Sequence, residues 1–389
     1  MKTLDLFRAS KLPVPASTAW YLETLGEFRG KQELYTRQSP QKLKVLREHA
    51  LIESAVSSNR IEGVSVEPSR IESVLIATKP LFRDRDEEEV RGYRDALGWI
   101  HGHSSEITFG EDALKRMHAM ARGQIWDAGQ YKEKDGDIIE RYADGRERVR
   151  FRPTPANETA VAMAQLMDTW GQCTREKWVP RSVALAAFNL DLLCIHPFRD
   201  GNGRMARALA TLVLTRSDIG EPEFCSIEEW LGANTEDYYS VLAHTGHGSW
   251  QPRSDPHLWL TFNLRAHHMQ AQTVARRVDE ARKTWSELDV LAQEHGLPER
   301  TLDAMFDAVL GYRVRRGGYM KRTGVTEQTA TRDLTALASA GILSPHGTGR
   351  GRHYIAGEPL HTIQDRRRAT RKPLRDPYPW MRAKLAEPV

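Results

Sequence analysis

The sequence predicts a mainly α-helical protein with one β-hairpin and a small C-terminal domain built from three helices and two strands. Apolar residues recur at helical spacing through most of the 389 residues, whereas strand-like patterns appear near residues 138–151 and 342–355. A chain of this length is too long for one typical core. We therefore expect several domains, and an apolar content of 40% is enough to build their cores.

Changes in pattern along the chain predict five segments. We expect an N-terminal helical region over residues 1–105, a central domain over 106–252, a connector helix over 253–295, a three-helix domain with a two-stranded wing over 296–358, and a basic tail over 359–389. The tail contains Arg366, Arg367 and Arg368 together with several prolines. Because this composition buries little apolar surface, we expect the tail to be mobile rather than folded.

The composition argues against a membrane protein and against a disulfide-linked or zinc-bound one. No uninterrupted apolar run approaches eighteen residues, and no signal-like apolar run follows Met1. The three cysteines, Cys173, Cys194 and Cys225, show no CxxC spacing. We expect a soluble, cytoplasmic protein with no membrane partner.

The densest chemistry lies in the twelve residues His196-Pro197-Phe198-Arg199-Asp200-Gly201-Asn202-Gly203-Arg204-Met205-Ala206-Arg207. Pro197 should end the apolar helix before it and leave His196 at the helix exit, because proline lacks an N–H and clashes with the preceding turn. Apolar residues at helical spacing follow the Gly201–Gly203 loop, so this loop should open a second helix. The free N–H groups of that helix form an anion site that a phosphate can approach closely.

Charged side chains of both signs accompany the predicted anion site. Arg204 and Arg207 lie three residues apart on one face of the second helix and offer planar, permanently charged groups to further phosphates. Asp200 offers a hard oxygen ligand that suits Mg²⁺. Each feature taken singly is more often structural. The combined spacing HPFxDGNGRxxR is too long and constrained for a chance match.

These twelve residues resemble the signature of the Fic (filamentation induced by cAMP) family at every motif position. The resemblance covers roughly residues 50–250. It implies a Fic-type helical domain with a β-hairpin flap, and an enzyme, a protein adenylyltransferase, that transfers AMP from ATP to a Ser, Thr or Tyr hydroxyl of a target protein and releases diphosphate. The roles it implies are general base for His196, Mg²⁺ ligand for Asp200, anion binding for the Gly201–Gly203 amides and the Asn202 side chain, and binding of the β- and γ-phosphates for Arg204 and Arg207.

A second short pattern lies upstream, where Ser58, Glu62 and Gly63 end a predicted helix. Ser58 and Glu62 are four residues apart and therefore share one helix face. Alone they would be an ordinary surface pair. Beside the downstream motif they match the inhibitory pattern of the family, which is Ser or Thr, three residues, Glu, then Gly or Asn. The resemblance implies that Glu62 pairs with Arg207 and inhibits the enzyme within the same chain.

Two further features have both a structural and a functional interpretation. Residues 138–139 and 149–151 flank Asp144-Gly145 and predict a β-hairpin. It is either a plain surface hairpin or the family's flap, which holds the target segment by strand addition. Asn234 and Tyr238 match the region that contributes to the adenine pocket in the family, although a tyrosine on a helix equally suits a core.

Residues 296–358 resemble a winged helix-turn-helix. Helices are expected near residues 302–309, over 313–323 and after the N-cap Thr326, followed by a wing from Ile342-Leu343 and residues 353–355. The third helix would present Gln328, Thr329, Thr331 and Arg332, and the wing would present Arg350 and Arg352. Residues 311–389 contain 16 Lys and Arg against 6 Asp and Glu, a balance of +10 that favours DNA over a protein partner.

Two alternatives to AMP transfer follow from the same residues. One is a DNA-binding regulator whose Fic module senses a nucleotide, and the other is an enzyme that mainly removes AMP, with Glu62 positioning a water. The intact base beside the phosphate loop argues against a pure sensor. The sequence leaves open the target protein, the signal that relieves inhibition, and whether the protein forms a homodimer.

Overall fold

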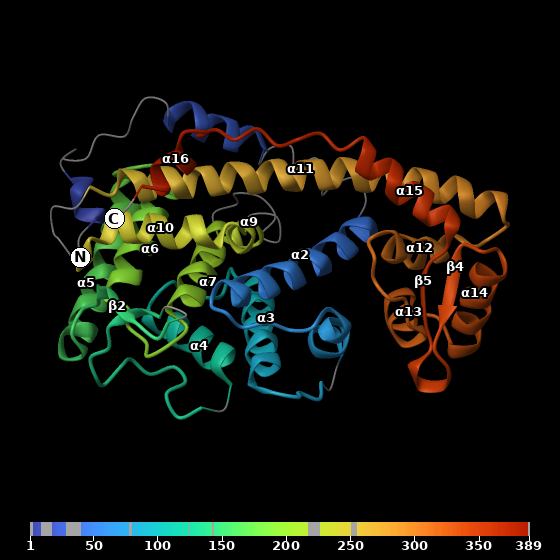
Figure 1. Ribbon diagram of the computed structural model, residues 1–389, viewed down its shortest axis with the longest axis horizontal. Helices are drawn as coiled ribbons and strands as arrows, with labels where there is room; N and C mark the ends of the chain where they lie inside the picture. The colour runs from blue at the N-terminus through green and yellow to red at the C-terminus, as the bar shows by residue number, and fades with distance from the viewer. Residues whose placement is uncertain are drawn as a thin grey trace. The chain divides into compact units, whose positions relative to one another are not determined.

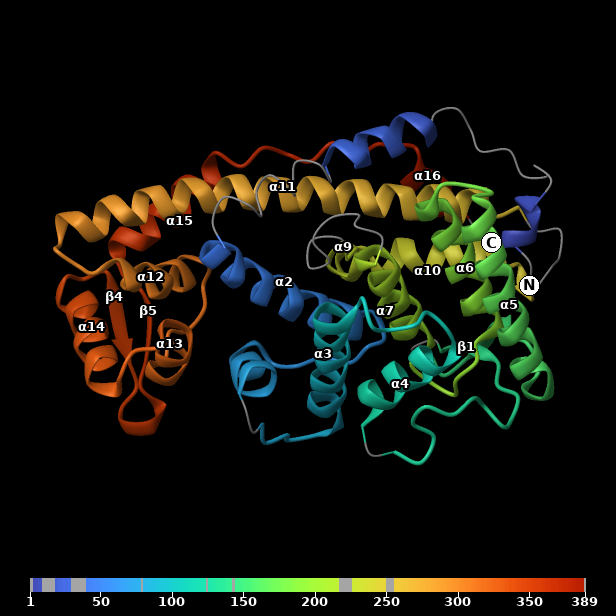
Figure 2. The same ribbon diagram turned by 180° about the vertical axis from the view of Figure 1, so that it is seen from behind.

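The structure is a computed structural model that describes residues 3–8, 18–28, 40–77, 80–123, 125–141, 144–216, 226–249 and 255–387. Within these ranges the chain is mainly helical with two small sheets, which confirms the predicted fold class (Figures 1 and 2). It divides into two compact units, Met1–Gln272 with Arg375–Val389, and Thr273–Leu374. Among the described helices, none combines the length and the apolar character that a bilayer span requires.

The larger unit contains most of the helices and one sheet. In chain order its elements are η1 (Leu4–Leu6), a helix over residues 18–28, α2 (Pro40–Ile61), η3 (Pro68–Arg70), the π-helical turn η4 (Glu72–Ile76), α3 (Arg85–His103), α4 (Glu111–Arg122), β1 (Ile138–Arg141), β2 (Glu147–Arg152), α5 (Ala156–Glu176), α6 (Arg181–Ile195), α7 (Asn202–Thr215), α9 (Glu228–Ala233), α10 (Thr235–Gly246), β3 (Gly248–Ser249), the first part of α11 (His257–Glu294) and α16 (Met381–Leu385).

Helices α6 and α7 form the centre of this unit. Twelve of the 15 residues of α6 are buried, as expected for a helix that is apolar on every face. Helix α5 packs against α6, while α3, α4 and α6 pack against α7 (Figure 1). The loop between α6 and α7, which carries the twelve-residue motif, is thereby fixed at both ends. Of the cysteines, Cys173 and Cys194 are buried and free, and Cys225 lies outside the described residues.

The predicted hairpin is present as β1 and β2, which pair antiparallel with Ile139 opposite Val149. The register shifts between Ile138 and Ile139. Strand β2 also pairs in parallel with the short strand β3 through Phe151 and Gly248, so the sheet order is β1-β2-β3. Strand β1 therefore forms one edge of the sheet.

The smaller unit holds the predicted three helices and two strands. Its elements are the rest of α11, η5 (Glu299–Thr301), α12 (Leu302–Val309), α13 (Arg316–Thr323), α14 (Glu327–Ser339), β4 (Leu343–His346), η6 (Gly349–Gly351), β5 (His353–Ala356) and α15 (Glu358–Ala369). Thr326 caps α14 as predicted, because its side chain accepts a hydrogen bond from the Thr329 N–H. Strands β4 and β5 pair antiparallel.

The prediction of a mobile tail over residues 359–389 is wrong. Helix α15 buries Leu360 and Ile363, which lie three residues apart on one face, and its arginines fall in the last turn, where the helix dipole favours positive charge. Helix α16 buries Met381 and Leu385 in the larger unit. The arginine-rich composition concealed these two apolar pairs, each at helical spacing.

Candidate active site

His196 lies at the exit of α6 with its base nitrogen free. It adopts the left-handed conformation, with φ of 51°, because Pro197 prevents the helix from continuing. Its Nδ1 lies 3.2 Å from the Leu193 carbonyl oxygen, which only accepts, so Nδ1 carries the proton and Nε2 is left as the base. Burial lowers the pKa of His196 to about 4. The imidazole is therefore neutral at pH 7.

The loop after His196 is closed by the Asn202 side chain. Asn202 Oδ1 accepts a hydrogen bond from the Phe198 N–H, and its Nδ2 donates to the Phe198 carbonyl, both at 2.8 Å. Both polar ends of the side chain thus have a partner within the loop, and the anion contact of this side chain stays a prediction. Gly201 has a φ of 82°, which favours glycine, and immediately precedes the first turn of α7.

His118 supports the same loop from below. Its ring stacks on Phe198 with centroids 3.9 Å apart. The Gly129 N–H donates to His118 Nδ1 at 2.8 Å, so Nε2 carries the proton and donates to the Asp200 carbonyl at 3.0 Å. His118 is therefore a buried residue that packs against the loop.

Arg207 brings together the two upstream residues that the sequence singled out. Its Nε donates to Ser58 Oγ, and its Nη2 donates to both the Ser58 carbonyl and Glu62 Oε1, all at 2.8 Å. The Arg207 side chain is 4% exposed, whereas that of Glu62 is 23% exposed. The predicted pair between Glu62 and Arg207 is therefore present, and one partner remains accessible to solvent.

Gly203 places this pair against the phosphate loop. A Cβ on Gly203 would collide with Glu62 Oε1 and would lie 3.0 Å from Arg207 Nη1. Among the described residues, Arg207 Nη1 has no hydrogen-bond partner although it is buried. An unsatisfied donor beside the first turn of α7 is where an anion would bind, and the Glu62 carboxylate lies at the edge of that position.

Arg204 lies deeper than the sequence predicted. Its side chain is 1% exposed, its Nη1 lies 2.6 Å from Glu89 Oε2, and it also donates to Asn59 Oδ1 at 3.1 Å. Its Nη2 is 3.7 Å from Asp200 Oδ2. Arg204 thus supports the loop from inside the protein. Its buried Nε, like Arg207 Nη1, has no hydrogen-bond partner among the described residues.

Asp200 sits at the rim of the loop, half exposed, with both carboxylate oxygens engaged. Oδ1 accepts from the Gly201 N–H, and Oδ2 is 2.6 Å from Arg122 Nη1. Burial raises the pKa of Asp200, but Arg204 and Arg122 outweigh it and keep the pKa below its usual range. Within the described ranges, no three His, Cys, Asp or Glu side chains are grouped to hold a metal. A single ionised carboxylate beside an anion site nevertheless suits Mg²⁺, which takes its other ligands from phosphates and water.

Glu228 is a buried carboxylate that the sequence did not single out. It is 1% exposed and accepts hydrogen bonds from the Tyr93 hydroxyl and, at 2.9 Å, from Ser226 Oγ. Burial raises its pKa, while the hydrogen bonds from Tyr93, Ser226 and Ser58 and the charge of Arg207 oppose that shift. The positive charge of Arg207 therefore acts on the Glu228 carboxylate.

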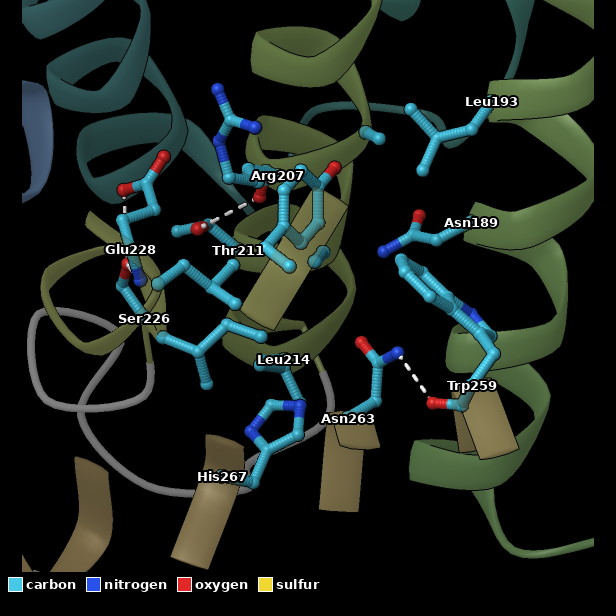
Figure 3. Close-up of a pocket in the computed structure, with 15 residues that line it drawn as sticks. Asn189, Leu193, Arg207, Thr211, Leu214, Ser226, Glu228, Trp259, Asn263 and His267 are labelled. Carbon is cyan, nitrogen blue, oxygen red and sulfur yellow. Dashed lines mark hydrogen bonds between the residues drawn. The ribbon is translucent and has the colours of Figure 1, made fainter. Parts of the chain in front are cut away.

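A small cavity lined by Arg207 lies between α6, α7, α9, α10 and α11. Figure 3 shows Glu228 and Ser226 on one side of it and Asn189 and Trp259 on the other. Its free volume of about 20 Å³ is enough for a water molecule and too small for a nucleotide.

The two residues matched to the adenine pocket lie in different surroundings. Tyr238 lines the cavity, is 4% exposed and belongs to a core cluster, and burial raises its pKa to about 12 while Arg207 opposes the shift. The Asn234 side chain donates to the Trp230 carbonyl at 2.7 Å. The structure thus brings Tyr238, but not the Asn234 amide, close to Arg207.

Four residues of the site were missed by sequence reasoning: Asn59, Glu89, Arg122 and Glu228. Asn59 lies one residue after Ser58 and so falls inside the pattern that was recognised. Glu89 meets Arg204 across 115 residues and Arg122 across 33. Its place in the acidic first turns of α3 gave only a local explanation for its charge. No local pattern marks the other two.

Comparison with known proteins agrees with this geometry. Residues 107–214 match the model of the Fic/DOC family. Protein adenylyltransferase Fic of Nematostella vectensis is 24% identical over 203 residues, which are 50% of this chain and 43% of that protein, so the chain spans less than half of that relative.

Solved structures show the same fold at low identity. A Fic family protein from Desulfovibrio desulfuricans aligns with a TM-score of 0.56 and 20% identity over 89% of this chain and 98% of its own. A Fic domain containing signalling protein from Bacteroides thetaiotaomicron aligns with a TM-score of 0.51 and 19% identity over 64% and 95%. The chain therefore carries a Fic domain, which spans residues 107–214.

Proposed function

We propose that this protein transfers AMP from ATP to a Ser, Thr or Tyr hydroxyl of a target protein and that Glu62 inhibits the transfer within the chain. The observation that carries the proposal is the neutral His196, with Nε2 free, at the start of a loop whose other end holds Arg207 and the first turn of α7. The name of the adenylyltransferase relative supports the same reaction. A cytoplasmic location is part of the proposal, because ATP is supplied there.

His196 Nε2 takes the proton of the target hydroxyl as the hydroxyl oxygen attacks the α-phosphorus of ATP. The bond from this phosphorus to the oxygen that bridges to the β-phosphate breaks, and diphosphate leaves. The lowered pKa of His196 keeps the base form available at neutral pH. The Leu193 carbonyl holds the ring orientation, so the proton is taken by one defined nitrogen.

The Gly201–Gly203 amides at the start of α7 bind phosphate oxygens, and Arg207 binds the terminal phosphates through its unpaired Nη1. Arg204 contributes its charge from beneath the loop. Asp200 would hold Mg²⁺ against the phosphates, where the ion supplies positive charge to the leaving diphosphate. Asn234 and Tyr238 remain the residues proposed to contact the adenine of ATP, and Tyr238 lies next to Arg207.

Inhibition follows from the position of the Glu62 carboxylate. The carboxylate accepts a hydrogen bond from Arg207 Nη2 and lies against Gly203. A terminal phosphate that enters this site is therefore repelled by the negative charge of Glu62 and finds Arg207 already paired. ATP is then bound in a pose whose α-phosphate is misaligned for attack. The opposite direction, AMP removal with Glu62 positioning a water, is distinguished by supplying AMP-modified target and measuring release of AMP.

His196→Ala tests the proposed reaction. Transfer of label from α-labelled ATP to protein should fall by roughly 10²–10⁴-fold, the usual contribution of a general base, while calorimetry finds ATP binding unchanged. Both measurements are made in a Glu62→Gly background so that the parent is active. Loss of ATP binding together with activity would show that His196 holds the loop rather than acting as the base.

We further propose that the smaller unit binds duplex DNA through phosphates. The favouring observation is that α14 exposes Gln328, Thr331 and Arg332, and β5 is preceded by the exposed Arg352. The side chain of Arg350, the other predicted wing contact, is outside the described part of the structure. A mobility-shift series with the full chain at several salt concentrations tests this, because phosphate contacts weaken steeply as salt rises.

A homodimer is a further proposal, which sedimentation of the full chain would test.

A further inference from the structure

Arg207 is held by two sets of groups that share its Nη2 and differ in burial. The Glu62 carboxylate contacts Nη2 near Gly203 and is partly exposed. The Ser58 hydroxyl and carbonyl contact Nε and Nη2, and Ser58 is 0% exposed. The Glu62 carboxylate is thus accessible to solvent, whereas the Ser58 groups lie in the interior.

Ser58 and Glu228 both lie near Arg207. The Ser58 hydroxyl accepts from Arg207 Nε at 2.8 Å, and the Glu228 carboxylate lines the small cavity that Arg207 also lines. Tyr93 and Ser226 donate to the same carboxylate, and Tyr93 Oη also lies 3.2 Å from the Arg204 carbonyl. The network thus connects four helices, α2, α3, α7 and α9, around the Arg207 guanidinium.

Close packing of α2 on α9 fixes Ser58 in place. A Cβ on Gly232 of α9 would lie 2.8 Å from Ser57 Cβ and 3.1 Å from the Ser57 carbonyl oxygen. The backbones therefore approach as closely as glycine allows at the residue next to Ser58. Glu62, in contrast, follows the last helical residue Ile61 and precedes Gly63, which has a φ of 78°. Glu62 thus lies at the helix end with a partly exposed side chain, whereas Ser58 lies within the helix and is buried.

We infer that Ser58 and Glu228 hold the Arg207 guanidinium in the same position whether or not Glu62 contacts it, and that this position serves ATP binding. We call these two residues the Arg207 seat. Ser58 is then not part of the inhibitory device. This inference rests on the proposed function. When Glu62 withdraws, Arg207 is a buried cation whose ion-pair partner is gone. The Glu228 carboxylate then remains as the buried countercharge, and Ser58 keeps the guanidinium oriented so that Nη1 faces Gly203. Ser58 and Glu228 are positioning residues, since they act through Arg207.

The two roles for Ser58 predict opposite effects of Ser58→Ala. If Ser58 served inhibition, Ser58→Ala would activate labelling as Glu62→Gly does. As part of the seat, Ser58→Ala leaves the parent inactive. In the Glu62→Gly background it raises the calorimetric Kd for ATP and the KM for ATP by about tenfold, because Arg207 Nε loses its acceptor, while kcat changes little. Glu228→Gln, which removes the charge at constant size, should weaken ATP binding in the same background.

Glu229→Gln is the matched control, because this neighbouring carboxylate accepts from Gln270 at 3.1 Å and does not line the cavity beside Arg207. It should leave the Kd for ATP unchanged. Activation of the parent by Ser58→Ala, or unchanged ATP affinity for both Ser58→Ala and Glu228→Gln in the Glu62→Gly background, overturns the inference. If Glu62→Gly alone binds no ATP, the proposed function itself is wrong, so the two failures are distinguishable.

Discussion

At the scale of single residues, the pKa of His196 is the property on which the proposed chemistry depends. Burial lowers it to about 4, against about 6.5 for an unperturbed imidazole. NMR titration of the histidine Cε1–H signals, with His196→Ala to assign the resonance, should give a midpoint near 4. A midpoint near 6.5 would mean that the ring is solvated, because burial is what lowers the pKa and the bond to the Leu193 carbonyl acts in the opposite direction.

Glu62→Gly should activate labelling by orders of magnitude. The variant removes the carboxylate that contacts Arg207 Nη2 and opens the space against Gly203. Loss of a mostly buried ion pair alone would destabilise the protein rather than speed labelling, so a large gain in rate indicates that the carboxylate had occupied the phosphate site.

Two further variants interpret the Glu62→Gly result. Glu62→Gln keeps the size of the side chain and should activate less, because the amide still fills the space. Adding Arg207→Ala to Glu62→Gly should abolish the gain. Labelling that stays within a few-fold of the parent, in a protein whose His196 is shown to be competent, would contradict self-inhibition.

The sequence located the residues of the active site better than it located their contacts. His196, Glu62 and Arg207 could be found because short, constrained patterns surround them. The burial of Arg204 could not be found, since its partner Glu89 lies far away in sequence and reaches it only after α3 packs on α7. The inward turn of the Asn202 side chain depends on the loop geometry, which no residue pattern encodes.

At the scale of elements, the contact between α2 and α9 controls where the Arg207 seat lies, and Gly232→Ala should disturb it. The added methyl would meet Ser57 at 2.8 Å, and overpacking of this kind costs about 1–3 kcal/mol. Gly98→Ala on α3 is the matched control. Its Cβ would meet only Arg94 Nη1, at 4.0 Å, so this variant should gain up to about 1 kcal/mol from better helix propensity.

Urea unfolding of both glycine variants measures the difference. A Gly232→Ala protein as stable as the Gly98→Ala protein would show that α2 and α9 are free to separate. In that case Ser58 would lack the rigid support on which its proposed role depends.

Elements with strong local signals were predicted well, and those with weak ones were not. The cap of α14 at Thr326, the end of α6 before Pro197 and the β1–β2 hairpin all depend on residues close in sequence. Helix α16 is a short helix whose stability comes from contacts with distant residues, since Arg265 on α11 pairs with Asp376 at 2.7 Å just before it. Such a helix has little intrinsic stability and becomes visible only in the fold.

At the scale of the whole molecule, the chain divides by charge as well as by structure. Residues 311–389 carry the excess of positive charge, and residues 311–374 of them lie in the smaller unit. The sequence predicted a separate C-terminal domain, but the unit boundary falls inside the continuous helix α11. A helical pattern does not show where one core ends and the next begins, because the pattern continues through both.

The proposed DNA contact of the smaller unit predicts a difference between two exposed arginines. Arg332 projects from α14 with its side chain 71% exposed and lies 3.9 Å from Asp333, while Arg366 on α15 is 59% exposed and donates to Glu287 at 2.9 Å. If α14 is the helix that approaches the phosphates, Arg332→Ala should weaken binding of the full chain to duplexes of any sequence. It should also make the plot of log K against log salt concentration less steep by about one unit of slope, because one phosphate contact is lost. Arg366→Ala should change neither, since this charge is already paired. Equal losses for the two variants would mean that binding follows net charge without a defined face, and no loss for either would leave the smaller unit as a protein-binding module.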